Sequence, residues 1–151
     1  MSKYIPITPE GLATFKEEKI QLFVKRKTAV VNLRTAREMG DLSENAAYHV
    51  ARRELSSIDS RLRHLEYIIR VAKVVEKTDS DAVDIGSNVK LQGNNMTVEY
   101  LLVGGYESDP AQGKISHHSP IGRAIIGRKT GDDITVNTPK GLVTYRIVEV
   151  K

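Results

Sequence analysis

The stretch Gly40-Asp41-Leu42-Ser43-Glu44-Asn45 decides the fold of this chain, because a long heptad pattern runs up to it and away from it. After the stretch, apolar side chains recur in alternating steps of three and four, at Tyr48, Ala51, Leu55, Ile58, Leu62, Leu65, Ile69 and Ala72. Before it, the same spacing places Leu12, Phe15, Leu22, Ala29, Leu33 and Ala36. The pattern predicts an antiparallel helical hairpin whose tip is residues 40–45.

The helix limits and the register of this hairpin follow from the same pattern. Thr8 before Pro9 is typical of an N-cap followed by proline, so the first helix should begin there and end near Met39. The second helix should run from about Ser43 to Val74. Folding the arms about the tip pairs Ala29 with Leu55, Leu22 with Leu62 and Leu12 with Ala72. Lys19 and Arg26 fall on the seam, where their stems can pack while their charges reach water.

The residues of the tip allow two interpretations. Gly40 is suited to end the first helix, and either Asp41 with Glu44 or Ser43 alone could cap the second, which would make both acids purely structural. Alternatively, Asp41 and Glu44 are functional carboxylates presented at the end of the hairpin. No core lies beyond Leu42, so its side chain either packs against the capped helix end as a hydrophobic staple or contacts a partner.

Positive charge is concentrated in the hairpin. The 151-residue chain carries a formal net charge of +4, and residues 1–78 hold 15 basic against 10 acidic residues while residues 79–151 hold 8 against 9. Four arginines gather behind the tip, at Arg34, Arg37, Arg52 and Arg53. They can bind phosphates, or form a surface ladder with Glu38 and Glu54. Tyr48 can stack on a nucleobase or belong to the seam.

The second half of the chain changes to a period of two, which is typical of strands. Strands are expected at Asn88–Leu91, Met96–Val103, Ile115–His118, Asp133–Thr138 and Leu142–Val150. One short helix interrupts them, with Ser119 as its cap, Pro120 at its first position and Gly127 at its end. The predicted class is α+β, with an antiparallel helical hairpin over residues 1–78 and an antiparallel sheet domain over 79–151. His117 and His118 should point to opposite faces and share no metal ion.

Composition excludes several classes of protein. The chain has no cysteine, so it can form neither a disulfide framework nor a thiolate metal site. No signal peptide opens the sequence and no apolar run approaches about 18 residues, so no membrane insertion is expected. We expect a cytoplasmic monomer.

Two motifs give the chain a specific resemblance. Residues 40–48, Gly-Asp-Leu-Ser-Glu-Asn-Ala-Ala-Tyr, resemble the tip signature of the bacterial transcript cleavage factors of the GreA/GreB family. Residues 119–127, Ser-Pro-Ile-Gly-Arg-Ala-Ile-Ile-Gly, resemble the C-terminal motif of that family. Ala47 stands where many members carry an acid, and Ser119 stands where GreB-type members tend to carry aspartate, which favours a GreA-like member.

The resemblance implies a fold and a mechanism. The second domain would be FKBP-like, although the absence of Trp and Phe from residues 79–151 argues against a prolyl isomerase. The hairpin would enter the secondary channel of RNA polymerase and reach the 3′ end of a backtracked nascent RNA. Asp41 and Glu44 would help the polymerase hold a second Mg²⁺, so the isolated protein would bind no metal and cleave nothing. Leu42, Ser119, Pro120 and Ile121 would contact the polymerase.

Two other functions are compatible with these residues. A homologue of the same family could occupy the channel and inhibit the polymerase, but such inhibitors carry a more acidic tip. A coiled-coil scaffold without a polymerase partner would use Asp41 and Glu44 only as caps.

Overall fold

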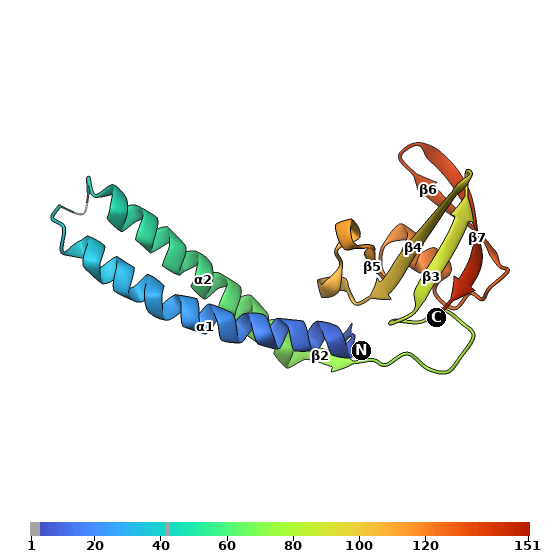
Figure 1. Ribbon diagram of the computed structural model, residues 1–151, viewed down its shortest axis with the longest axis horizontal. Helices are drawn as coiled ribbons and strands as arrows, with labels where there is room; N and C mark the ends of the chain where they lie inside the picture. The colour runs from blue at the N-terminus through green and yellow to red at the C-terminus, as the bar shows by residue number, and fades with distance from the viewer. Residues whose placement is uncertain (1–3, 42) are drawn as a thin grey trace. The chain divides into compact units, whose positions relative to one another are not determined.

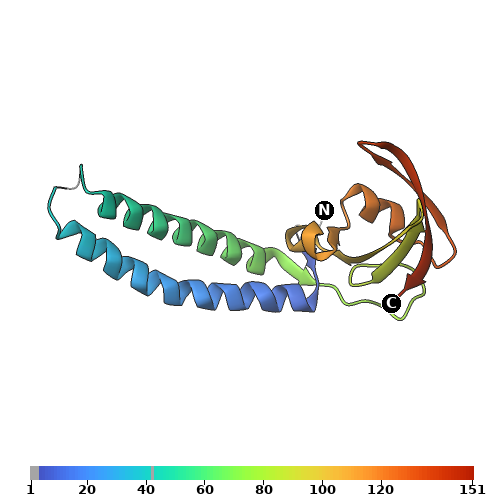
Figure 2. The same ribbon diagram turned by 45° about the horizontal axis from the view of Figure 1, so that its top comes forward.

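The computed structural model describes residues 4–41 and 43–151, which divide into two compact units. One unit, Ala13–Val71, is the helical hairpin. The other combines the residues up to Leu12 with Ala72–Lys151 and contains the sheet. Helix α1 spans Pro9–Arg37 and helix α2 spans Ala46–Val71, and the two run side by side to the tip (Figures 1 and 2). The predicted α+β class is confirmed, while a division at residue 78 stays a prediction.

The seam of the hairpin follows the expected register. Ala29, Ile58 and Leu62 form a buried cluster against which Leu22 and Leu55 pack, so both members of two expected pairs lie together. Near the base, Ile68 is buried, whereas the expected seam residue Ile69 is only half-buried. This difference is explained by the drift of an α-helix, about 20° per heptad, relative to an exact seven-residue repeat.

Helix α2 is shorter than expected at both ends. It begins at Ala46 rather than Ser43, and it ends at Val71 rather than Val74. Strand β2, Ala72–Val74, follows directly and pairs in parallel with strand β1, Ile5–Ile7. The predicted pairing of Leu12 with Ala72 in the helical seam is therefore wrong, because Ala72 is the strand partner of Ile5.

The first turn of α1 is fixed by a hydrogen-bond network within the sheet unit. Thr8 caps the helix as predicted, since its hydroxyl accepts the Gly11 N–H at 3.0 Å. The Glu107 carboxylate accepts the Thr8 hydroxyl, the Thr8 N–H at 3.0 Å and the Gly104 N–H at 2.9 Å. A Cβ on Gly11 would collide with this carboxylate, so a larger residue there would displace the Glu107 side chain from the network. The network joins β1 and α1 to a 3₁₀ helix, η1, at Gly105–Glu107.

Five strands form the larger sheet, in the order β5-β4-β3-β7-β6. Their bounds are Asn88–Gly93 for β3, Met96–Val103 for β4, Lys114–Ser116 for β5, Asp133–Thr138 for β6 and Gly141–Val150 for β7. All neighbours are antiparallel except β4 and β5, which are parallel. Helix η1 and a second 3₁₀ helix, η2, Pro110–Gln112, lie in the connection that makes this parallel pairing possible.

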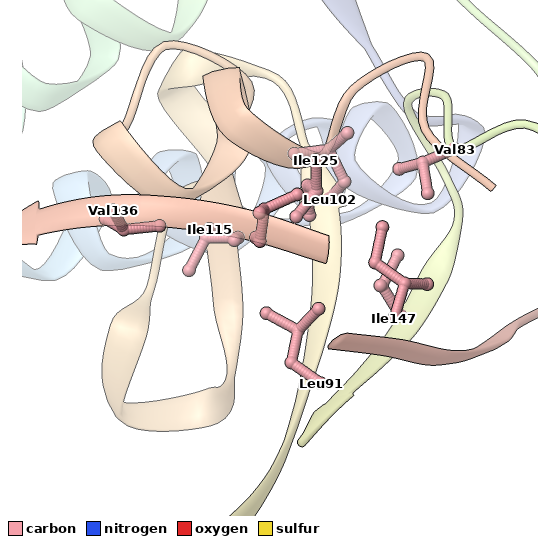
Figure 3. Packing of buried hydrophobic residues seen from close by; sticks show 9 residues of the cluster. Val83, Leu91, Leu102, Ile115, Ile125, Val136 and Ile147 are labelled. Carbon is pink, nitrogen blue, oxygen red and sulfur yellow. The ribbon is translucent and has the colours of Figure 1, made fainter. Parts of the chain in front are cut away.

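The core of this unit lies between the sheet and helix α3, Pro120–Ile125 (Figure 3). Its buried residues come from strands β3 to β7, from α3 and from the segment before β3. They are Val83, Val89, Leu91, Leu102, Ile115, Ile125, Ile134, Val136 and Ile147. Ser119 caps α3 as predicted, and Gly127 follows it at a φ of +78°. Among the described residues, no helix is long and apolar enough to cross a membrane.

Candidate functional site

The candidate site is the tip of the hairpin, where α1 ends and the chain reverses. The last hydrogen bonds of α1 include Glu38 N–H to the Arg34 carbonyl at 3.3 Å and Met39 N–H to the Ala36 carbonyl at 3.2 Å. Gly40 then adopts a φ of +125°, a conformation that favours glycine. Helix α1 ends at Arg37, two residues earlier than predicted, and the positive φ of Gly40 lies in the turn that follows.

Asn45, rather than Asp41 or Ser43, caps helix α2. Its side-chain oxygen accepts the Tyr48 N–H at 3.1 Å, and its amide nitrogen donates to the Ala36 carbonyl at 2.6 Å. One side chain thus satisfies the first turn of α2 and the last turn of α1 together. The structural interpretation of the tip acids is wrong on this point, because neither Asp41 nor Glu44 is needed as a cap.

Asp41 is exposed, and its carboxylate accepts hydrogen bonds from Ser43. Its Oδ1 accepts hydrogen bonds from the Ser43 N–H and the Ser43 hydroxyl, both at 3.0 Å. The backbone bond, followed by the hydroxyl bond, lowers the pKa of Asp41 below its ordinary value. Glu44 is also exposed, and within the described residues it makes no hydrogen bond or ion pair. Leu42 lies outside the described residues.

The tip lacks a complete metal site. In the part of the chain that the structure describes, no three His, Cys, Asp or Glu side chains are grouped so that they could hold an ion. Mg²⁺ takes six oxygen ligands in nearly ideal octahedral geometry, more than two exposed carboxylates supply. Asp41 and Glu44 fit Mg²⁺ in ligand chemistry, since both offer carboxylate oxygens, but other ligands must complete the shell.

The four arginines behind the tip are all exposed. The Arg37 guanidinium lies over the Tyr48 ring, 5.9 Å from its centroid, and Tyr48 is half-buried. Arg53 donates from Nε to the His49 carbonyl at 3.4 Å. The predicted ladder of these arginines with Glu38 and Glu54 is wrong, because none of the ion pairs found between described residues involves them. Their positive charge is available to a ligand.

The second group of predicted contact residues lies at the start of α3. The Ser119 hydroxyl accepts the Gly122 N–H at 3.0 Å and donates to the Ser116 carbonyl at 2.7 Å, so it is occupied by the fold. Ile121 is half-buried and packs against the core. Only Pro120 among the three is exposed.

The two adjacent histidines do not point apart as expected. Strand β5 ends at Ser116, so His117 and His118 lie in a turn, where side chains no longer alternate. Their ring centroids are 3.8 Å apart. Burial, followed by the charge of His118, lowers the pKa of His117. No third ligand of a metal ion lies with them in the described part of the chain.

Comparison with known families and proteins covers nearly the whole chain. Residues 5–74 match the model "Transcription elongation factor, N-terminal" and residues 77–151 match "Transcription elongation factor, GreA/GreB, C-term". The chain is 41% identical to "Transcription elongation factor GreA" of Thermoanaerobacter pseudethanolicus, covering 100% of this chain and 99% of that protein. It is 42% identical to the protein of the same name from Lactococcus lactis subsp. cremoris, with 99% of each covered.

Among solved structures, the chain resembles one titled "Structure of the transcription factor Gfh1", with 25% identity, 99% of both chains covered and a TM-score of 0.49.

Proposed function

Because the chain belongs to the GreA/GreB family of transcription elongation factors, we propose that it stimulates RNA polymerase to cleave backtracked nascent RNA. The hairpin enters the secondary channel of the polymerase and brings its tip to the extruded RNA 3′ end. The observation that carries this proposal is the division of roles at the tip. Asn45 makes the structural contacts, and the Asp41 and Glu44 carboxylates stay exposed and available.

The two carboxylates act together with ligands of the polymerase. Asp41 and Glu44 would hold Mg²⁺ jointly with acidic side chains of the polymerase active site, either directly or through water. When bound, Mg²⁺ lowers the pKa of a coordinated water and stabilises the charge that develops on the phosphodiester. The hydrogen bonds from Ser43 lower the pKa of Asp41 and so favour the ionised form that a metal ligand requires. Glu44, which has no partner among the described residues, is free to accept the proton of the water.

The arginines and Tyr48 hold the RNA. Arg34, Arg37, Arg52 and Arg53 are exposed and unpaired with acids within the described residues, as a phosphate-binding cluster requires. Tyr48, whose side chain is half-buried, is the candidate for stacking with a base. The docking contacts would come from Leu42 at the tip and from the exposed Pro120, with Ser119 and Ile121 supporting it.

A cleavage assay on stalled complexes tests the proposal. Purified bacterial RNA polymerase is halted on a scaffold whose RNA 3′ end is unpaired, and the labelled RNA is followed after this protein and Mg²⁺ are added. We expect a shortened RNA that the polymerase then extends, and no cleavage of the same RNA by the protein alone. Slower elongation without cleavage would instead identify a channel-occupying inhibitor. Failure to bind polymerase would identify a scaffold.

A further inference from the structure

Helix α1 carries a second row of apolar side chains, apart from its seam with α2. Ile20, Val24 and Val31 are 61%, 61% and 55% exposed. Steps of four and seven residues return to the same side of a helix, so these three side chains lie in one row. The seam with α2 uses other positions of α1, among them Leu22 and Ala29. Helix α1 is therefore apolar on two sides, and the second side is open to a partner.

The second row continues as a coiled-coil seam in both directions. Ala13, Glu17 and Lys27 are also exposed. Together with the apolar row they give positions 13, 17, 20, 24, 27 and 31, which alternate steps of four and three. We call these six positions the outer seam. Their spacing indicates that the partner is another helix.

The two charged positions of the outer seam are placed symmetrically. Glu17 and Lys27 lie five residues on either side of Leu22. Neither side chain takes part in the ion pairs found between described residues. A contact with two-fold symmetry pairs residues reciprocally, so two antiparallel copies of α1 centred on Leu22 would form every pair twice. The facing pairs are Glu17 with Lys27, Ile20 with Val24 and Ala13 with Val31.

A hollow beside the outer seam has the form that helix packing requires. Phe23, Arg26, Lys27 and Val30 line this hollow of about 460 Å³, and Phe23 is 45% exposed. The four residues are spaced as i, i+3, i+4 and i+7, which places them around one depression of the helix surface. In knobs-into-holes packing, four residues of one helix form such a hole for a side chain of the facing helix.

We propose that the outer seam binds α1 of a second copy of this chain in antiparallel orientation. The charges favour this partner, because an unrelated helix would not require Glu17 and Lys27 to lie symmetrically about one point. A contact along one helix face falls among the small interfaces, below about 1,200 Å², which are weak. The dimer therefore dissociates on dilution, and the monomer expected from the sequence is the form at low concentration.

Sedimentation velocity of the full chain, from about 1 µM to about 1 mM, tests the proposal. We expect the average mass to rise toward that of a dimer. Val24→Lys should weaken association by about tenfold or more, because it places a charge against Ile20 of the second copy. Its melting in dilute solution should match that of the unmodified protein, since the site is exposed. A constant monomer mass over the whole range would overturn the proposal.

Charge reversal tests the antiparallel alignment. Glu17→Lys and Lys27→Glu each bring like charges together and should weaken association, whereas the double variant and an equal mixture of the two single variants should restore it. In a parallel pair Glu17 would face Glu17, and the double variant would restore nothing, which would overturn the proposed alignment. Lys25→Glu is the matched control. It lies seven residues from Glu18, on the side of α1 that pairs with Arg61 of α2, and should leave association unchanged.

The same variants distinguish a second copy from RNA polymerase as the partner. If a second copy is the partner, Val24→Lys in dilute solution binds purified polymerase as tightly as the unmodified protein does. Weaker polymerase binding by Val24→Lys, together with an unmodified chain that stays monomeric, would assign the outer seam to the polymerase and overturn the proposal. Neither measurement depends on stimulation of RNA cleavage.

Discussion

At the scale of single residues, Ser43 favours the ionised form of Asp41. The two hydrogen bonds from Ser43 lower the pKa of a carboxyl group that is fully exposed to water. A carboxyl group with a lowered pKa keeps its interactions above that pKa and loses them as pH falls through it. Asp41 therefore remains an ionised ligand at pH values where an ordinary aspartate is partly protonated.

Replacing Ser43 by alanine removes the hydroxyl bond and leaves the backbone bond. We expect the pKa of Asp41 in Ser43→Ala to rise toward its ordinary value, and the acidic limb of the cleavage activity to move to higher pH. An NMR titration of the Asp41 carboxyl carbon measures the change directly. Ser60→Ala, at an exposed site in α2, serves as the control, and an unchanged Asp41 titration in Ser43→Ala would contradict this account.

The sequence identified the charged residues of the tip but not the capping residue. Asp41, Ser43 and Asn45 are all good N-caps, and they lie within five positions. Which of the three caps α2 depends on where the helix begins. That position depends in turn on the distance that the chain must cross between Ala36 and the first turn of α2. Among the described residues of the tip, Asn45 is the one whose side chain makes hydrogen bonds to both helices.

At the scale of elements, Asn45 joins the two helices at the point where the seam ends. Asn45→Ala removes the cap of α2 and the bond to Ala36, and the loss of a cap typically costs about 1 kcal/mol. We expect a lower melting temperature and faster hydrogen exchange in the first turn of α2. Asn32→Ala, on the exposed surface of α1, should leave both nearly unchanged. Equal melting of Asn45→Ala and the unmodified protein would show that the cap contributes nothing.

Strands β3, β4, β6 and β7 were predicted within about two residues, because each has six or more residues over which a period of two can be recognised in the sequence. Strands β1 and β2 were missed because each has three residues and no alternation. The bond between Thr8 and Glu107 was missed for a related reason. It joins residues far apart in the sequence, and a short-range pattern carries no information about such pairs.

At the scale of the whole molecule, the hairpin and the sheet unit differ in charge, which suits them to different contacts. The positive charge of the hairpin suits contact with RNA, whereas the sheet unit is nearly neutral and suits docking by packing. At the start of α3, Ser119 makes capping hydrogen bonds and Ile121 packs against the core, whereas Pro120 is exposed. A test of docking must therefore change Pro120 and leave the Ser119 cap intact.

Pro120→Glu places a charge at the first position of α3, where a carboxylate is compatible with the helix dipole. We expect a higher protein concentration for half-maximal cleavage, an unchanged rate at saturation and almost unchanged melting. Pro110→Glu makes the same change at the first position of η2 and should not affect the concentration dependence. Normal polymerase binding by Pro120→Glu would show that the docking surface does not include Pro120.

The central claim is that the tip supplies catalytic carboxylates to the polymerase, and cleavage by tip variants tests it most directly. Asp41→Asn and Glu44→Gln change exposed side chains, which usually alters stability by no more than about 0.5 kcal/mol. Glu38→Gln removes a neighbouring exposed carboxylate as the control. We predict that each tip variant competes with the unmodified protein for polymerase yet loses most cleavage of backtracked RNA, while Glu38→Gln retains it. Cleavage at the unmodified rate by either tip variant would contradict the role of that carboxylate.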